Sequence, residues 1–442
     1  MEYTTLLSRL DKEFPHGALT HDAFKEFLMS VVPFLEKSGA KEEDFERLVR
    51  LCIPDRTISF KVVWEDDKGR MQTNLGYRVQ YSAALGPYKG GLRFDPSVTP
   101  DVLTFLGFEQ IFKNSLTGLP LGGGKGGSDF DPKGKSGAEM RRFCVAFMAE
   151  LSKYIGPSTD VPAGDIGVGG REIGYLYGAY KRIANRTDGT LTGKGVGYGG
   201  SHIRTEATGY GAVYFVEAML THAGKVIQGA RALVSGSGNV ATHVAEKLIQ
   251  VGALPLTLSD RGGYIFKEDG LTQEIVTAVK ELKENGGALK EFVLPTGVTY
   301  HEGKVWGAHD AELIIPAATQ HELNRKDAEE VMKRGAMLVA EAANMPSTLD
   351  AIEYFMEKGI LFGPAKAVNA GGVAVSGLEM RQNASHAEWP RETVDGELHA
   401  IMRHIHEVCV QYGSGGEKID YVKGANVGGF VRVFDAMQRL GW

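Results

Sequence analysis

The sequence predicts an α/β protein of two domains, and three observations support that prediction. The chain has 442 residues, more than a single hydrophobic core usually organises. Before about residue 200, helical periodicity and two-residue alternation occur in separate stretches, whereas afterwards short apolar strands alternate with helices. That second pattern is typical of a parallel sheet covered by helices. We therefore expect a first α/β domain over 1–200, a second over 201–370, and C-terminal helices over 371–442 that pack back on the first domain.

The first domain is expected to combine helices with strands. Apolar residues at helical spacing predict helices over 1–14, 21–39, 41–54, 101–118, 138–156 and 171–185. Alternation in 57–82 predicts two strands joined by a turn at "DDKG". We interpret "PLGGGKGGSDFDP" at 120–132 as a glycine-rich loop and "PYKGGLRFDP" at 87–96 as a tight glycine-rich turn, because glycine is common where a backbone turns.

The second domain is expected to repeat a strand–helix unit. The apolar strand "ARALVS" at 230–235 precedes a glycine turn, a helix over 240–250 and a strand that ends in "TLSD". Further short apolar strands are predicted at 311–318 and 336–344, and a last one at "ILFG". A parallel sheet with helical connections follows from this order.

Composition excludes several classes of protein. A formal net charge of −6, with no long basic run, argues against a nucleic-acid or membrane surface as the main partner. Cys52, Cys144 and Cys409 lack disulfide or zinc spacing and are expected to be thiols in a reducing compartment. No His, Asp and Glu cluster has ligand spacing, so the sequence predicts no metal site. Without a signal-type segment or a long apolar run, the expected location is cytoplasmic.

The second domain carries a dinucleotide-binding motif. Gly236, Gly238 and Ala241 have G-x-G-x-x-A spacing directly after an apolar strand and before a helix. The glycines permit a tight turn and a close approach of the backbone to a pyrophosphate, which the helix N-terminus then attracts. A Rossmann-like fold is therefore predicted. Asp260, at the end of the next strand, favours NAD, whereas Ser259 and Arg261 beside it favour the 2′-phosphate of NADP.

Lys125 stands in the glycine-rich stretch of the first domain. The P-loop pattern fails there, because Gly126 follows Lys125 and Leu119 stands where the first glycine is required. A desolvated lysine has a lowered pKa and can act as a base near neutral pH. Lys89 lies in the other glycine-rich turn, and Lys113 lies on a predicted helix face with Gln110.

These lysines predict a site for an anion with more than one carboxylate. Asp165, within "DVPAGDIGVGG", adds a carboxylate that can shuttle a proton, although a helix cap or a loop hydrogen bond explains it equally well. Together with a nicotinamide domain, the set predicts a dehydrogenase acting on a small dicarboxylate. A non-catalytic nucleotide-sensing protein is the alternative from another class, and retention of all four charged residues speaks against it.

Six stretches in order resemble the hexameric glutamate dehydrogenases of the Glu/Leu/Phe/Val dehydrogenase superfamily. They are "PYKGGLRF", "EQIFKNSLTG", "LPLGGGKGGSDFDP", "PAGDIGVG", "RTEATGYG" and "NAGGVAVSGLEM". The resemblance covers essentially the whole chain. It implies a homohexamer that interconverts glutamate with 2-oxoglutarate and ammonium.

The resemblance also implies a role for each matching residue. Lys125 would activate water and polarise the 2-oxo group, Asp165 would pass protons to and from the amino nitrogen, and the Gly164 carbonyl would help to hold ammonium. Lys113 and Gln110 would bind the α-carboxylate, and Lys89 with Ser376 the side-chain carboxylate. Besides Gly236 and Gly238 of the motif, the implied cofactor contacts are Thr208, Ser237, Asn239 and Val240, with Ala318 and Asn344 near the adenosine ribose and the nicotinamide.

The resemblance narrows the substrate and the cofactor. Lys89 favours glutamate over leucine, phenylalanine or valine, because an ammonium group would be left unpaired beneath an apolar side chain. "SDR" at 259–261 is more similar to the "SDS" of NADP-type members than to the Gly-Pro-Asp of NAD-type members. We therefore expect NADP and ammonia assimilation. NAD-linked glutamate breakdown and a leucine-type amino-acid dehydrogenase are the alternatives.

Overall fold

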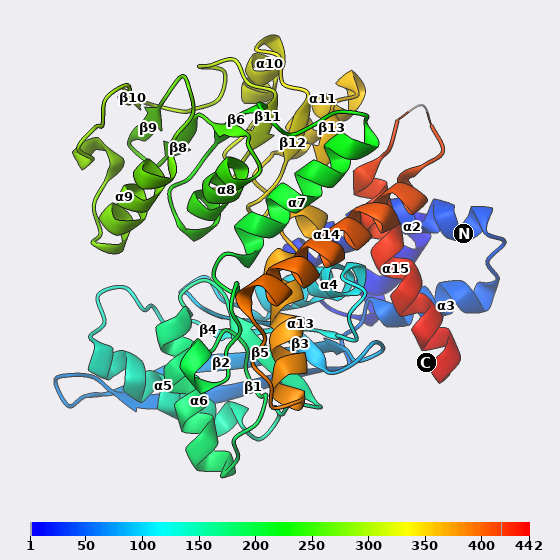
Figure 1. The fold of residues 1–442 in the computed structure, drawn as a ribbon. Helices are drawn as coiled ribbons and strands as arrows, with labels where there is room; N and C mark the ends of the chain where they lie inside the picture. Colours follow the sequence, from blue (N-terminus) through cyan, green and yellow to red (C-terminus); the bar gives the residue numbers. More distant parts are fainter. Residues whose placement is uncertain (1, 417) are drawn as a thin grey trace. The chain divides into compact units, whose positions relative to one another are not determined.

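The computed structural model describes residues 2–416 and 418–442 (Figure 1). Contacts divide the chain into two compact units. Unit 1 comprises 1–204, 373–394 and 426–442, and unit 2 comprises 205–372 and 395–425. The first boundary falls close to the expected residue 200. The C-terminal segment, expected to pack back on the first domain, is shared: 373–394 and 426–442 group with unit 1, but 395–425 groups with unit 2.

Unit 1 is built around a mixed five-stranded sheet with the strand order β1-β2-β4-β3-β5. β1 pairs antiparallel with β2 and β2 antiparallel with β4, whereas β3 runs parallel to both β4 and β5. The strands are β1 (Arg56–Glu65), β2 (Met71–Ser82), β3 (Tyr88–Phe94), β4 (Gly123–Ser128) and β5 (Asp160–Gly164). The helices are α1 (Tyr3–Glu13), α2 (Ala18–Lys37), α3 (Glu42–Leu51), α4 (Pro100–Leu116), α5 (Gly137–Leu151) and α6 (Gly170–Ala184).

The two glycine-rich stretches are strands, so their interpretation as a loop and a turn was wrong. The physical reason is the closeness of the neighbouring backbone. A Cβ on Gly90 of β3 would lie 1.6 Å from the carbonyl oxygen of Gly124 on β4, and one on Gly123 would lie 2.5 Å from the Ile111 side chain on α4. Glycine is disfavoured in strands in general, but here only glycine fits.

Two apolar cores cover the two faces of this sheet. One contains Tyr77 and Val79 of β2 together with residues of α1 to α4 and of the last helix, α15 (Tyr421–Leu440). The other contains Val62 of β1 and Leu92 of β3 together with residues of α5 and α6. Because side chains alternate along a strand, every second residue of β3 and β4 faces α4.

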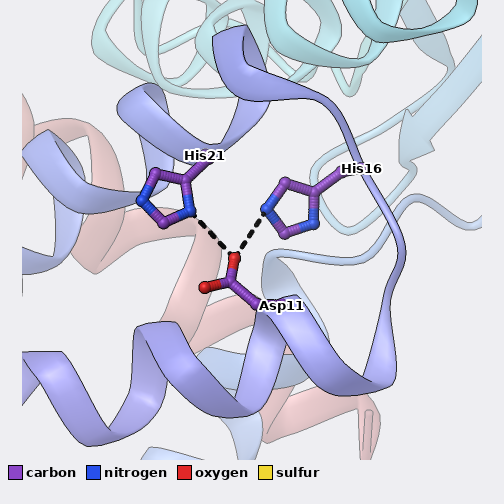
Figure 2. A group of neighbouring side chains, drawn as sticks. All are labelled: Asp11, His16 and His21. Atoms are coloured by element: carbon purple, nitrogen blue, oxygen red, sulfur yellow. Dashed lines mark hydrogen bonds and ion pairs between the residues drawn. The ribbon is translucent and has the colours of Figure 1, made fainter.

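A short turn joins α1 to α2 at the start of the chain. Asp11 near the end of α1, His16 in the turn and His21 in the first turns of α2 point toward one another (Figure 2). Asp101, at the start of α4, accepts hydrogen bonds from the backbone nitrogens of Gly17 (3.0 Å) and Thr20 (3.3 Å). The carboxylate thus satisfies donors that the N-terminus of α2 would otherwise leave free.

Unit 2 contains a parallel sheet with helical connections, as predicted, so the two-domain α/β fold with a Rossmann-like second domain is confirmed. The strand order is β13-β12-β11-β6-β7, and all pairs are parallel. Its strands are β6 (Arg231–Val234), β7 (Leu254–Pro255), β11 (Leu313–Ile315), β12 (Leu338–Ala340) and β13 (Leu361–Gly363). An antiparallel sheet, β10-β9-β8, comprises β8 (Thr257–Ser259), β9 (Gly263–Phe266) and β10 (Thr299–Glu302).

Helices complete unit 2 and the C-terminal segment. Those of unit 2 are α7 (Ala207–His222), α8 (Asn239–Gln250), α9 (Gln273–Glu284), α10 (Arg325–Lys333), α11 (Leu349–Lys358) and α12 (Ala365–Val368). The unit boundaries fall within α13 (Gly371–Ala384), α14 (Arg391–Gly413) and α15. Across 2–416 and 418–442, no helix is both long enough and apolar enough to cross a membrane.

Candidate active site

The predicted lysines of β3 and β4 lie on the face of the unit 1 sheet that α4 covers. Lys89 and Arg93 of β3 point away from Leu92, whose side chain belongs to the core beneath α5 and α6. Lys125 stands directly opposite Val79 in the β2–β4 ladder, and Val79 belongs to the core on the α4 side. The sheet register therefore gathers these cations on one surface.

Lys125, which is buried, and Asp165, which is partly buried, form an ion pair. Lys125 Nζ lies 3.1 Å from Asp165 Oδ1, and Arg93 Nε donates to Asp165 Oδ2 at 2.7 Å. Burial lowers the pKa of Lys125, and the opposing pull of Asp165 does not restore it. Burial alone would raise the pKa of Asp165, but the charges of Lys125 and Arg93 hold it below its usual value. The carboxylate therefore stays charged beside a lysine that releases its proton more readily than usual.

Lys113 of α4 faces this pair. Burial, and then the charge of Lys125, lower the pKa of Lys113 to about 8, while Asp165 opposes the shift. One turn of helix separates Lys113 from Gln110, as the sequence indicated. Lys113 therefore loses its proton more readily than an ordinary lysine.

Asn114, which sequence reasoning missed, fixes the position of α4 over the sheet. Its amide nitrogen donates to the backbone carbonyls of Lys89 (3.0 Å) and Gly122 (2.6 Å). Its amide oxygen accepts from Gln110 Nε2 at 2.7 Å. A buried asparagine that uses both ends of its amide in this way orients the Gln110 side chain as well as the helix.

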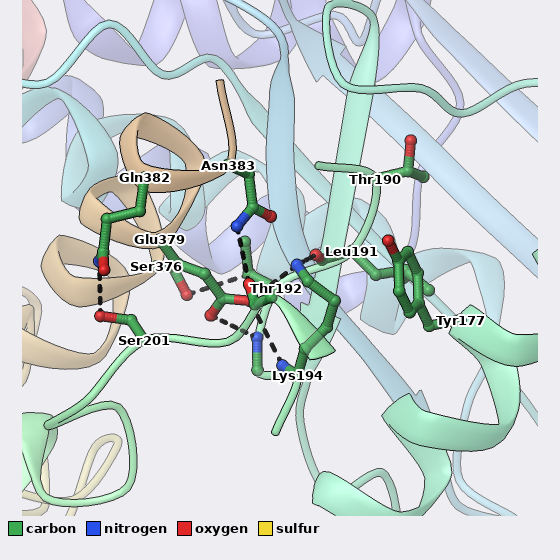
Figure 3. Close-up of polar contacts among 12 residues, drawn as sticks. Tyr177, Thr190, Leu191, Thr192, Lys194, Ser201, Ser376, Glu379, Gln382 and Asn383 are labelled. Carbon is green, nitrogen blue, oxygen red and sulfur yellow. Dashed lines mark hydrogen bonds and ion pairs between the residues drawn. The ribbon is translucent and has the colours of Figure 1, made fainter. Parts of the chain in front are cut away.

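Lys89 and Ser376 are connected through Thr192, which sequence reasoning also missed. Lys89 Nζ donates to Thr192 Oγ1 at 2.7 Å. Thr192 Oγ1 in turn donates to Ser376 Oγ at 3.2 Å (Figure 3). Lys89 is only 1% exposed, and burial holds its pKa well below the usual range, with the neighbouring Arg204 as the next cause. The ammonium and two hydroxyl groups form a polar cluster that needs an anion to be fully satisfied.

A buried glutamate orders the segment that carries Thr192. Glu379 of α13 accepts hydrogen bonds from the backbone nitrogens of Gly193 (2.9 Å) and Lys194 (3.3 Å). Lys194 Nζ lies 2.8 Å from Glu379 Oε1 and donates to the Leu191 carbonyl at 2.5 Å (Figure 3). These contacts hold the backbone on both sides of Thr192, so Glu379 acts as a positioning residue for the Lys89 cluster.

Arg204 adds a further cation, and no sequence signal singled it out although it opens the "RTEATGYG" motif. Burial lowers its pKa, with Glu379 opposing the shift, and its Nε is a buried donor without a hydrogen-bond partner among the described residues. Its charge also lowers the pKa of both Lys89 and Lys113. The cations of this site outnumber Asp165 and Glu379, which suits an anionic ligand with two charges.

In unit 2, the glycine motif takes the geometry that a dinucleotide needs. Gly236 has φ of +84°. A Cβ on it would lie 2.9 Å from the Ala317 carbonyl and 3.2 Å from the Cβ of Ala241. Nothing lies within 4 Å of a Cβ built on Gly238, which precedes the N-terminus of α8. A crowded first glycine and an open second one above a helix N-terminus fit the pyrophosphate of a dinucleotide.

The negative charge of the Asp260 carboxylate is compensated by a lysine and by two backbone N–H groups. Its Oδ2 lies 2.9 Å from Lys283 Nζ and accepts from the backbone nitrogen of Leu289 at 2.8 Å, while Oδ1 accepts from that of Gly262 at 3.0 Å. Ser259 Oγ accepts from the nitrogen of Gly236 at 2.8 Å. Arg261 beside it is exposed. Lys283, missed in the sequence because it lies a whole helix away, adds a second cation at this point.

The other residues expected to contact the cofactor lie at the carboxyl ends of the parallel strands or at helix starts. Strands β6, β11 and β12 are neighbours in the sheet, so the segments that follow them meet at one edge. The residues in question are Ser237, Asn239 and Val240 after β6, Ala318 after β11, Asn344 after β12, and Thr208 at the start of α7. Asn239 Nδ2 donates to the Thr205 carbonyl at 2.8 Å and Asn344 Oδ1 accepts from Asn369 at 2.9 Å.

Two family models match most of the chain. Residues 54–182 match the model described as Glu/Leu/Phe/Val dehydrogenase, dimerisation domain. Residues 199–441 match the model described as Glutamate/Leucine/Phenylalanine/Valine dehydrogenase.

Individual relatives match along their full length. The chain is 50% identical to the glutamate dehydrogenase of Bacteroides thetaiotaomicron over all of both chains. It is 49% identical to the NADP-specific glutamate dehydrogenase of Escherichia coli, over 99% of this chain and 98% of the relative. The crystal structure of Plasmodium falciparum glutamate dehydrogenase superposes with a TM-score of 0.96 at 48% identity, over 100% of this chain and 95% of that one. Further relatives at similar identity are named NAD(P)-specific or NAD-specific.

Proposed function

The chain belongs to the Glu/Leu/Phe/Val dehydrogenase family, and from that premise we infer its reaction and propose a role for each residue of its site. It is an NADP-dependent oxidoreductase that converts L-glutamate, water and NADP⁺ into 2-oxoglutarate, ammonium, NADPH and a proton, reversibly. The Lys125–Asp165 pair is the observation that carries the chemistry, because it combines an activated base with a proton carrier.

We propose that the two carboxylates of glutamate are held by two separate groups of residues. Lys113 and Gln110, both on α4, would bind the α-carboxylate beside the Lys125–Asp165 pair. Lys89 and Ser376 would bind the side-chain carboxylate, with Thr192 hydrogen-bonded to both. Binding at two ends fixes the Cα between them, which lowers the entropic part of the barrier.

Proton transfer would be divided between Lys125 and Asp165. Asp165 carries protons to and from the amino nitrogen, and the carbonyl of Gly164, the preceding residue, helps to hold the departing ammonium. Lys125, with its lowered pKa, takes the proton of the water that attacks the imine carbon and afterwards polarises the 2-oxo group. Arg93 keeps the Asp165 carboxylate in place throughout.

The cofactor, when bound, supplies hydride transfer between the substrate Cα and its nicotinamide ring. We propose that Gly236, Ser237, Gly238, Asn239 and Val240 receive the pyrophosphate. Thr208 would also contact the cofactor, with Ala318 near the adenosine ribose and Asn344 near the nicotinamide. Ser259 and Arg261 would receive the 2′-phosphate. Lys283 supports this assignment because it neutralises Asp260, which would otherwise repel a phosphate.

Arg261→Ala is expected to raise the Kd for NADPH by about tenfold, because a charge-assisted contact to the 2′-phosphate is lost. The Kd for NADH should change less than about twofold. Both constants can be measured from the fluorescence of the reduced nicotinamide on binding. Arg334→Ala, which removes an exposed arginine elsewhere in unit 2, is the matched control. Equal weakening of both cofactors by Arg261→Ala would contradict the assignment.

The KM for 2-oxoglutarate is expected to rise with pH above about 8, where Lys113 loses its proton. The charged form binds the α-carboxylate, so the KM should increase about tenfold per pH unit beyond the pKa. Initial rates at saturating ammonium across the alkaline range measure this. Lys113→Arg retains a charge that does not titrate there and should show a flatter profile. Identical profiles for the two proteins would show that another group is responsible.

The proposed reaction is tested by initial rates with 2-oxoglutarate, ammonium and either NADPH or NADH. Rapid oxidation of NADPH with little oxidation of NADH is expected. A preference for NADH would retain the reaction but assign the cofactor ribose to Asp260. A complete lack of turnover with both cofactors would refute the interpretation of the Lys125 site as the catalytic site of a glutamate dehydrogenase.

We propose that the chain assembles as a homohexamer. β1 is an edge strand, and edge strands leave unpaired backbone groups that another chain can cover. Val63, Met71 and Val145 are 43%, 65% and 46% exposed and line a hollow of about 480 Å³ with Arg141 and Arg142. Exposed apolar side chains rimmed by arginine fit a subunit interface. Light scattering on the purified protein should give six times the mass of the chain.

A further inference from the structure

Three potential metal ligands converge at the turn between α1 and α2, a site separate from those described above. Asp11 Oδ1 lies 2.9 Å from His21 Nδ1 and 3.2 Å from His16 Nε2 (Figure 2). One ligand atom from each residue lies within 4.8 Å of the other two. The sequence predicted no metal site, because the three residues are five apart and resemble no known ligand spacing.

The hydrogen bonding of His16 leaves a lone pair at the centre of this cluster. Its Nδ1 lies 2.5 Å from the backbone carbonyl of Phe14, and a carbonyl oxygen can only accept, so Nδ1 carries a proton. In the neutral ring Nε2 is then an acceptor, and it faces the carboxylate of Asp11, which is also an acceptor. Two acceptors at 3.2 Å need a cation or a shared proton between them. A histidine whose other nitrogen donates to a carbonyl is the usual arrangement of a metal ligand.

The His16 ring is held rigidly, whereas the opposite side of the cluster is open. The side chain of His16 is only 3% exposed. Its ring stacks on Phe14 with centroids 5.8 Å apart and meets the edge of Phe24 at 5.0 Å. Asp11 and His21 side chains are 43% and 38% exposed. One ligand is thus fixed in advance, and solvent can reach the point where an ion and its remaining waters would lie.

Two of the three ligand-atom separations are close to those that zinc requires. Zinc bonds of about 2.0–2.2 Å at a tetrahedral angle place neighbouring ligand atoms roughly 3.3 Å apart. The two observed nitrogen–oxygen separations, 2.9 and 3.2 Å, are close to that value. Two imidazoles and one carboxylate are ligands of borderline softness, which select zinc, cobalt or nickel over magnesium and calcium.

We propose that Asp11, His16 and His21 bind one divalent transition-metal ion of the zinc class, with water completing the coordination. The ion joins the end of α1 to the start of α2. Because Asp101 ties the start of α2 to α4, the bound ion also braces the helix that carries Gln110 and Lys113. Metal binding to the folded chain therefore raises its thermal stability.

The test uses the full chain without an affinity tag, stripped of metal by a chelator and titrated with Zn²⁺ in a calorimeter and with Co²⁺ in a visible spectrometer. One ion per chain is expected, with visible Co²⁺ bands typical of a mixed nitrogen and oxygen site and a Tm that rises with Zn²⁺. His21→Ala and Asp11→Asn should each weaken Zn²⁺ binding by about thirtyfold or more. Amination of 2-oxoglutarate in metal-free buffer should be unchanged in both variants.

His399→Ala is the matched control, because His399 is also exposed and lies 3.4 Å from a carboxylate, that of Glu217. It should bind Zn²⁺ like the unaltered chain. The proposal is overturned if the unaltered chain binds neither ion. It is also overturned if both ligand variants bind normally, or if Mg²⁺ displaces Co²⁺ at comparable concentration.

Discussion

Lys125→Ala is expected to lower kcat for glutamate oxidation by about 10⁴-fold, the upper end of the range for loss of a general base. The variant loses both the base and the charge that polarises the 2-oxo group. NADP⁺ affinity should change less than about twofold, because all proposed cofactor contacts belong to unit 2. Stopped-flow rates and cofactor titration measure the two effects separately.

Two companion variants separate the roles of Lys125. Lys125→Arg keeps the positive charge beside Asp165 but cannot release its proton, so it should remain as inactive as the alanine variant if proton transfer is essential. Lys133→Ala removes an exposed lysine from the turn after β4 and should leave kcat unchanged. Substantial turnover by Lys125→Ala would refute the assignment of the base.

Lys89→Leu is expected to lower kcat/KM for glutamate by about 10³-fold or more, while the apolar amino acid norvaline loses little or gains. The ammonium that meets the side-chain carboxylate is replaced by an alkyl group that fits an apolar side chain. Specificity constants for both substrates, compared in one protein preparation, give the ratio directly. An equal loss on both substrates would remove Lys89 from the side-chain site.

The thermal stability of Lys89→Leu is the control for this prediction, because it shows whether the variant still folds. Lys89 is 1% exposed and its pKa lies well below the usual range, so the ammonium is costly to bury in the folded chain. Replacing Lys89 with an apolar side chain removes this desolvation cost. In the unaltered chain Thr192 also donates to Ser376, a contact that does not involve Lys89. The Tm of the variant should therefore not fall below that of the unaltered chain.

The sequence predicts the fold because most elements follow simple periodicity. The helices over 101–118 and 171–185 appear as α4 and α6, and the two strands around "DDKG" appear as β1 and β2. The glycine motif was placed correctly because it lies between an apolar strand and a helix, a context that requires no tertiary information. The glycine-rich strands β3 and β4 could not be predicted in this way, since what selects glycine is the backbone of a neighbouring strand.

The residues of the candidate site also fall into two groups, those that the sequence predicted and those that it did not. Lys125, Lys113 and Asp165 were identified from local composition, and the structure brings them together. Thr192 was not identified, because its partner, Lys89, lies more than a hundred residues away in the sequence. Lys283 was not identified either, because a strand and a helix separate it from its partner, Asp260. Such pairs carry no local pattern. The roles of all these residues stay predictions until the variants are measured.

The crowding around Gly90 and Gly123 also limits how this protein can diverge. Any side chain at either position collides with fixed neighbouring atoms, so no series of small, individually tolerated substitutions leads away from glycine there. Lys89 of β3 and Ser376 of α13 lie close by, and their side chains can be exchanged without moving the backbone. The glycines of β3 and β4 therefore tolerate substitution far less than the side chains that lie around them.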